Sequence, residues 1–238
     1  RLSATGPTIR DVYPQPFGFR EFWIEGKRFY LNGSEIKLRP TTYSRYAKKK
    51  TLEDIQQEME LGLNFIEMWP EDYTRRGSLD EIRNLPQLTD QAGIPISANV
   101  AYMKRVIGRK QWDDAGRRKE WERIMEREVR SYRNHPSVVM YAHTGNAVGN
   151  FGDLHPRRIG QKGFSILQEY QIRRDRVFTL IDQIQAISDK PIYSHAGADN
   201  GEVYTSNTYL DFMPLQEREE MLSYWTEHGE LPFMAVEF

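Results

Sequence analysis

The stretch NHPSVVMYAHTGNAVGNFGD, residues 134–153, is the part of the sequence that most clearly indicates a fold. Pro136 ends the charged helix before it, because proline lacks a backbone donor and restricts the residue that precedes it. The apolar run at residues 138–142 contains β-branched and aromatic side chains and is long enough for a buried strand but too short for a helix. Polarity then changes abruptly at His143, which is typical either of a strand cap or of the strand end where α/β barrels place their reactive groups.

The composition excludes several classes of protein. With 39% hydrophobic and 28% charged residues, the 238-residue chain has the make-up of a globular domain. Its 33 basic and 34 acidic residues nearly balance, which gives no electrostatic support for binding nucleic acid or a membrane surface. Cysteine is absent and the five histidines lack metal-ligand spacing, so we predict neither a metal site nor a cofactor. No apolar run approaches the roughly 20 residues of a membrane span, and the first residues lack the apolar core of a signal peptide.

The beginning of the chain has a different pattern from the remainder. The sequence FGFREFWIEGKRFYLNG, residues 17–33, alternates aromatic and polar side chains and ends in a probable Asn-Gly turn. This alternation is typical of an antiparallel hairpin. We therefore interpret residues 1–33 as a β-hairpin lead-in, or as the last strands of a preceding β domain, and residues 34–238 as a second domain.

From residue 34 onward, strand and helix patterns alternate. Alternating βα units with short loops imply parallel strands and right-handed crossovers. Seven such strands predict an α/β fold, a (β/α)8 TIM barrel that lacks its last unit, and the structural alternative is a doubly wound open sheet. No glycine-rich phosphate loop is present, which argues against nucleotide binding. The expected strands cover residues 35–39, 64–69, 94–100, 138–142, 191–194, 203–207 and 233–236, and the expected helices cover about residues 51–62, 78–92, 117–133, 164–188 and 215–228.

The residues at the ends of these strands are the candidates for chemistry, because barrel enzymes place their catalytic groups there. They combine carboxylates, amides, hydroxyls and aromatic rings. Such a set suits a polyhydroxylated substrate, whose hydroxyl groups take hydrogen bonds while its C–H faces pack on aromatic rings. The candidates are Arg39, Glu67, Trp69, His143, Asn146, His195, Asn207, Tyr209 and Glu237.

Four stretches of the sequence resemble the family 2 glycoside hydrolases. FGFREFWIEGKRFYLNGSEIKLRP, residues 17–40, resembles the join between the immunoglobulin-like domain and the barrel of that family. LGLNFIEMWP, NHPSVVMYAHTGN and LPFMAVEF resemble its second, fourth and seventh barrel strands, in the same order. The resemblance implies a glycosidase barrel, an oligosaccharide or glycoside as partner, further domains in the same parent chain, and a secreted or periplasmic location.

The resemblance also implies roles for individual residues. Glu237 matches the nucleophile, and Asn146 matches the asparagine that holds the 2-hydroxyl of the sugar. The position of the acid/base glutamate is occupied by Ala147. Retaining hydrolysis uses two carboxyl groups about 5–5.5 Å apart, and alanine cannot supply one of them. Tyr209 matches a tyrosine that orients the nucleophile, and the remaining candidates for substrate contact are Arg39, Trp69, His143, His195 and Asn207.

Three interpretations of Ala147 remain open. It could be an engineered acid/base knock-out, a natural divergence in which Asp153 or Glu67 supplies the proton, or the mark of a non-hydrolytic barrel that only binds carbohydrate. Glu67 itself stands where the family usually has arginine. The residues on both sides of Ala147 also differ from the family pattern, which favours natural divergence.

Overall fold

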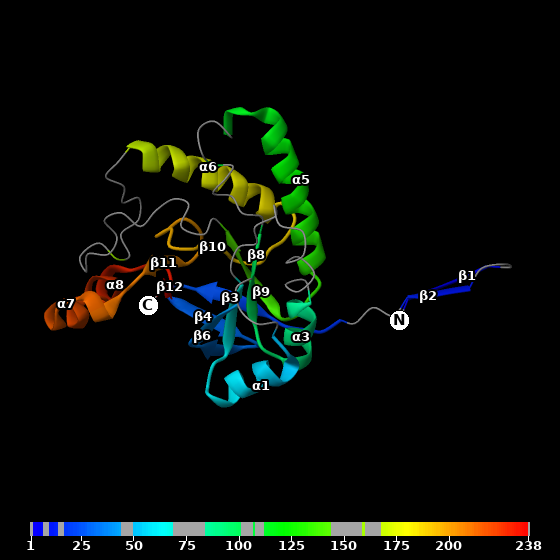
Figure 1. Cartoon of the computed structure of the whole chain (residues 1–238), viewed down its shortest axis with the longest axis horizontal. Helices are drawn as coiled ribbons and strands as arrows, with labels where there is room; N and C mark the ends of the chain where they lie inside the picture. The colour runs from blue at the N-terminus through cyan, green and yellow to red at the C-terminus, as the bar shows by residue number, and fades with distance from the viewer. Residues whose placement is uncertain are drawn as a thin grey trace.

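The computed structural model contains one parallel sheet of five strands and a separate parallel pair (Figure 1). The five-stranded sheet has the order β10-β9-β8-β7-β6, and β11 pairs with β12. This arrangement confirms the predicted α/β fold with parallel strands. The parallel strands are β6 (Pro40–Tyr43), β7 (Phe65–Met68), β8 (Ile96–Asn99), β9 (Val138–His143), β10 (Ile192–Ser194), β11 (Tyr204–Asn207) and β12 (Phe233–Glu237). The structure describes residues 2–6, 10–13, 17–43, 50–68, 84–100, 107, 112–143, 159 and 168–237.

Helices cover the outer side of the sheet. In Figure 1, α5 and α6 lie together on one side of the molecule, α1 and α3 lie together on another, and α7 and α8 lie beside β11 and β12. No helix in the described part of the chain is long and apolar enough to cross a membrane. The helices are α1 (Leu52–Glu60), α3 (Leu85–Ala92), α5 (Ala115–Tyr132), α6 (Gln168–Gln185), α7 (Leu215–Glu220) and α8 (Ser223–His228), with a short 3-10 helix η2 (Leu210–Phe212).

The predicted first barrel strand, residues 35–39, is wrong. The turn at Asn32 and Gly33, which have φ values of 49° and 84°, reverses the chain as a hairpin turn requires. The residues after the turn therefore pair back as β5 (Ser34–Ile36) in an antiparallel sheet with β3 (Phe22–Glu25) and β4 (Arg28–Leu31). The first parallel strand is β6 instead.

Two further differences concern the ends of the chain. A hairpin of β1 (Leu2–Thr5) and β2 (Arg10–Tyr13) stands apart from the rest of the molecule in Figure 1. The predicted helix over residues 215–228 is divided into α7 and α8, and Met221 between them is buried in a small cluster with Tyr204.

Alternation of side chains along the parallel strands creates two cores. Ile66 and Met68 of β7 belong to a large outer core between the sheet and the helices. Phe65 belongs to an inner core together with residues of β9, β10 and β12. Because successive side chains of a strand point to opposite faces, Glu67 shares the inner face with Phe65. The antiparallel sheet packs against this inner core through Phe29, Phe22, Ile24 and Ile36.

The N-terminus of α1 offers a direct test of the local structure. The Thr51 hydroxyl accepts a hydrogen bond from the Asp54 amide, and the Asp54 carboxylate accepts one from the Thr51 amide. Losing such a cap costs about 1 kcal/mol, so Thr51→Ala should lower the urea midpoint of unfolding. Thr179→Ala is the matched control, since Thr179 lies exposed inside α6 and caps nothing, and alanine is the better helix former. An equal decrease of the urea midpoint in both variants would contradict the assignment of Thr51 as the cap of α1.

Candidate active site

A continuous chain of hydrogen bonds joins polar side chains of the five-stranded sheet to those of the parallel pair. Its members come from β7, β8, β10 and β12 and from the loops that follow β10 and β11. Because the strands are parallel, the loops after them meet at one edge of the fold. In order along the chain of hydrogen bonds, the members are Ser97, Tyr193, Glu67, His195, Glu237 and Tyr209.

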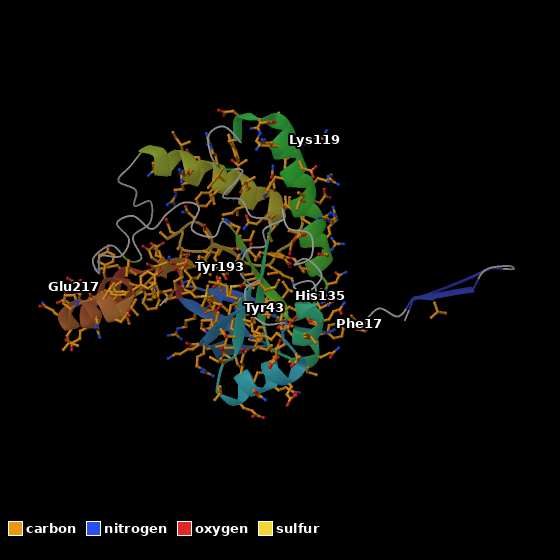
Figure 2. All side chains as sticks on the ribbon, viewed as in Figure 1. Phe17, Tyr43, Lys119, His135, Tyr193 and Glu217 are labelled. Atoms are coloured by element: carbon orange, nitrogen blue, oxygen red, sulfur yellow. The ribbon has the colours of Figure 1, made fainter. Side chains whose placement is uncertain are left out.

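Glu67 is the buried carboxylate of this cluster. One of its oxygens, Oε1, accepts hydrogen bonds from the Tyr193 hydroxyl at 2.8 Å and from His195 Nδ1 at 3.0 Å. The Tyr193 hydroxyl also lies 2.8 Å from Ser97 Oγ. Burial and the negative charge of Glu67 raise the pKa of Tyr193 well above its usual value, so the phenol keeps its proton and donates it. Figure 2 labels Tyr193 in the interior of the molecule.

His195 connects the two carboxylates of the cluster. Its Nδ1 faces Glu67, and its Nε2 lies 3.1 Å from Oε1 of Glu237. Burial by itself lowers the pKa of His195, but hydrogen bonds and charge from Glu67 and Glu237 more than offset this, so the pKa is raised overall. The imidazole therefore places positive charge beside Glu237.

Glu237 is the carboxylate that solvent can reach. Its side chain is 20% exposed, against 4% for Glu67. His195 holds its Oε1, and the Tyr209 hydroxyl donates a hydrogen bond to its Oε2, which raises the pKa of Tyr209. In the β11–β12 pair, Asn207 is in register with Glu237. A partly exposed carboxylate with both oxygens held in place can act as a nucleophile or as a general base.

The structure thus brings five of the predicted site residues together, namely Glu67, His195, Asn207, Tyr209 and Glu237. Sequence reasoning missed Tyr193 and Ser97, because it considered only the last residues of each strand. The alternation of side chains was the signal that could have found them, since both share the inner face of the sheet with Glu67. Trp69, Asn146, Ala147 and Asp153 lie outside the described residues.

Arg39 does not lie at the carboxyl end of a parallel strand, which the prediction of its contact with substrate assumed. Arg39 precedes β6, so it lies at the amino end of the parallel strands and not at the edge where Glu237 lies. Its backbone amide donates to the Asn64 side chain at 2.7 Å, and its Nε donates to the Gly62 carbonyl at 2.5 Å. The error follows from the misplaced first strand.

The predicted contact of His143 with substrate is likewise not supported by the position of its side chain. In the β9–β10 pair, Ala142 is in register with Tyr193, and both belong to the inner core. The next residue, His143, therefore points to the opposite, outer face. Burial lowers the pKa of His143 to about 3, and neither ring nitrogen has a hydrogen-bond partner among the residues that the structure describes. The His143 side chain is therefore neutral, buried and outside the hydrogen-bonded cluster, while its backbone carbonyl accepts a hydrogen bond from the His195 amide at 3.1 Å.

Two other features bear on possible ligands. Within the described ranges, no group of three or more histidine, cysteine or acidic residues is placed to hold a metal ion. A cavity of about 850 Å³ lies between Trp23 and Lys190 at the amino ends of β9 and β10, away from the cluster. Its position makes it unsuited to chemistry at Glu237.

Comparison with known proteins gives a match of fold. No family model and no curated protein matches the chain. Among solved structures, a β-glucuronidase from Parabacteroides merdae matches with a TM-score of 0.69 and 18% identity, over 97% of this chain and 28% of that one. A family 2 β-galacturonidase from Eisenbergiella tayi, bound to galacturonate, matches with a TM-score of 0.60 and 17% identity, over 91% of this chain and 38% of that one.

A third enzyme gives the same result. The β-glucuronidase from Ruminococcus gnavus, in complex with a uronic isofagomine, matches with a TM-score of 0.63 and 14% identity, over 99% of this chain and 41% of that one. The chain therefore spans between 28% and 41% of the length of these three enzymes. Over nearly its whole length, the chain has the fold of part of a family 2 glycoside hydrolase.

Proposed function

We propose that the chain is the catalytic part of a glycoside hydrolase related to family 2, with Glu237 as the nucleophile. The observation that carries the proposal is the setting of Glu237: a partly exposed carboxylate whose two oxygens are held by His195 and Tyr209. These two hydrogen bonds fix the orientation of the carboxylate, the form in which a glutamate acts as a nucleophile. The fold match adds support, since the compared enzymes are glycosidases.

In the proposed reaction, a Glu237 oxygen attacks the anomeric carbon while the bond from that carbon to the leaving oxygen breaks. Water then attacks the same carbon, its proton goes to the group that protonated the leaving oxygen, and the bond from the carbon to Glu237 breaks, which releases the sugar and regenerates the carboxylate. Asn146 would hold the 2-hydroxyl group, and Asn207 and Trp69 would contact the sugar. No cofactor is needed for any of these steps.

The leaving oxygen needs a proton, and Ala147 cannot provide it. Glu67 is a poor candidate for the donor, because its side chain is buried and is already engaged by Tyr193 and His195. Asp153, six residues after Ala147, is therefore our candidate for the donor. A natural divergence of this kind remains our interpretation of Ala147.

We also propose that the two parallel sheets belong to one (β/α)8 barrel. Contacts across the gap between β10 and β11 support this, because Ala198 pairs with Thr205 and the Thr205 hydroxyl donates to the Ser194 carbonyl. On the other side, β6 and β12 border a cavity of about 210 Å³. The lead-in from a preceding β domain would extend beyond residue 33 to include β5, the incomplete barrel would begin at β6, and the parent chain would carry further domains.

The substrate would be a β-linked glycoside or oligosaccharide. The compared enzymes include two β-glucuronidases and a β-galacturonidase, so aryl β-uronides are the first substrates to test. The alternative function is a carbohydrate-binding barrel without turnover. Ala147 is the observation that favours it, because it removes one of the two carboxyl groups that retaining hydrolysis uses.

Replacing the nucleophile is the first test. Glu237→Gln should lower kcat on an activated aryl glycoside by more than about a thousandfold, because an amide cannot attack the anomeric carbon. Glu227→Gln is the control, since Glu227 is exposed on α8. Near-equal activity of the Glu237 variant and the wild type would refute the assignment.

Azide distinguishes the interpretations of Ala147 in the wild-type chain. If the acid/base position is merely vacant, azide should accelerate release of the sugar from Glu237, and natural substrates should react poorly. If another carboxylate donates the proton, natural substrates turn over without azide. Sugar binding without turnover under either condition would support the carbohydrate-binding alternative.

Tyr209 provides a second, graded test. A hydrogen bond to a charged group contributes about 1.5–3 kcal/mol, so Tyr209→Phe should lower kcat about ten- to hundredfold while the fold persists. Tyr224→Phe is the matched control, because the Tyr224 ring stacks near His228 on α8, away from Glu237. An unchanged kcat in the Tyr209 variant would mean that this hydroxyl does not support the nucleophile.

A further inference from the structure

The contacts of His195 limit its protonation state. Both ring nitrogens lie within 3.1 Å of a carboxylate oxygen, Nδ1 on Glu67 and Nε2 on Glu237. A neutral imidazole carries only one N–H group. In the neutral form, one nitrogen lone pair would therefore face a carboxylate oxygen at hydrogen-bond distance, which is repulsive. The imidazolium form donates to both carboxylates at once.

A second donor besides His195 holds Glu67 in place. Tyr193 donates to the same oxygen that faces His195, and Ser97 lies behind Tyr193 at 2.8 Å. The side chains of Glu67 and His195 are each 4% exposed, so water does not compete for these hydrogen bonds. Glu67 is therefore a fixed negative charge directed at the ring of His195.

Four titratable side chains contact His195 or its partners, and none of the four carries a positive charge. The groups that face it or its partners are Glu67 from β7, Tyr193 from β10, Glu237 from β12 and Tyr209 after β11. Two of these are carboxylates, and the two phenols stay protonated because their pKa values are raised. In the part of the chain that the structure describes, His195 thus meets a carboxylate at each ring nitrogen.

We propose that Glu67 and His195 act as one positioning unit, which retains a proton on His195 and so keeps Glu237 oriented for attack. This inference rests on the proposed role of Glu237 as nucleophile. The proton stays on His195 throughout the reaction and is not transferred to the substrate. When alkaline pH removes it, the ring can no longer donate to Glu67 and Glu237 at once, so the orientation of Glu237 is lost and turnover falls with rising pH.

The titration of His195 can be followed without any activity, by NMR of the full chain labelled with 15N-histidine. His195→Gln identifies the resonances. A free histidine loses its proton near pH 6.5, and we expect His195 in the wild type to remain an imidazolium well above that. Glu67→Gln should lower the pKa of His195 by about 1–3, the usual effect of an adjacent opposite charge. Glu128→Gln, which alters another buried carboxylate on α5, should leave it unchanged.

Kinetics then test whether the unit serves the reaction. Glu67→Gln should move the alkaline limb of the kcat profile to lower pH, in parallel with the NMR titration, and change KM little. Glu67→Asp, which restores the charge, should recover part of the wild-type profile. If Glu67→Gln does not fold, the wild-type titration together with Glu67→Asp still provides the test.

Each outcome has a distinct meaning. Titration of His195 near pH 6.5 in the wild type, or an unchanged titration in Glu67→Gln, would overturn the positioning unit. The positioning unit would also be overturned if the NMR titration of His195 moves in Glu67→Gln while the alkaline limb of the kcat profile stays at the same pH. A raised titration that depends on Glu67, in a wild-type chain without turnover on any glycoside, would support the charged unit and overturn the glycosidase assignment instead.

Discussion

The site depends on the compensation of one buried charge. Glu67 lies on an inner strand with a side chain that is only 4% exposed, and removing a carboxylate from water costs several kcal/mol unless donors replace the lost hydration. Tyr193 and His195 are those donors, and they come from a strand and a loop more than a hundred residues further along the chain. The same contacts join β7 to β10, and through Glu237 to β12. The charge of Glu67 thus connects the five-stranded sheet to the β11–β12 pair.

The apolar residues beneath this cluster explain why its side chains are held in a single arrangement. Phe65 lies on the same face of β7 as Glu67, and residues of β9, β10 and β12 complete the inner core. The antiparallel sheet closes this core from its other end through Phe29. Close packing leaves little room for other rotamers. The carboxylate of Glu67 is therefore directed toward the edge of the fold where the loops after the strands meet.

Most of the strand order could be predicted from the sequence, because apolar runs bounded by turn residues are a strong local signal. The runs at residues 64–69, 138–142 and 203–207 became β7, β9 and β11 with boundaries that differ by at most one residue, and the pairing of Tyr209 with Glu237 was expected. The predictions failed where a single residue decides where a strand begins or to which face a side chain points. The hairpin turn moved the first parallel strand and with it Arg39, and the two-residue period of β9 turned His143 to the outer face. Contacts between distant strands, such as Glu67 with His195, leave no local trace in the sequence.

Two departures from the pattern of the resembling family have opposite consequences. Ala147 removes a proton donor, which taken alone suggests a site that no longer reacts. Glu67, in place of an arginine, would repel Glu237, yet His195 lies between them with one ring nitrogen on each carboxylate. If Glu237 is the nucleophile, both of its oxygens are held for attack, by His195 and by Tyr209. These contacts therefore support the proposed enzyme with a relocated proton donor more than the proposed carbohydrate-binding barrel.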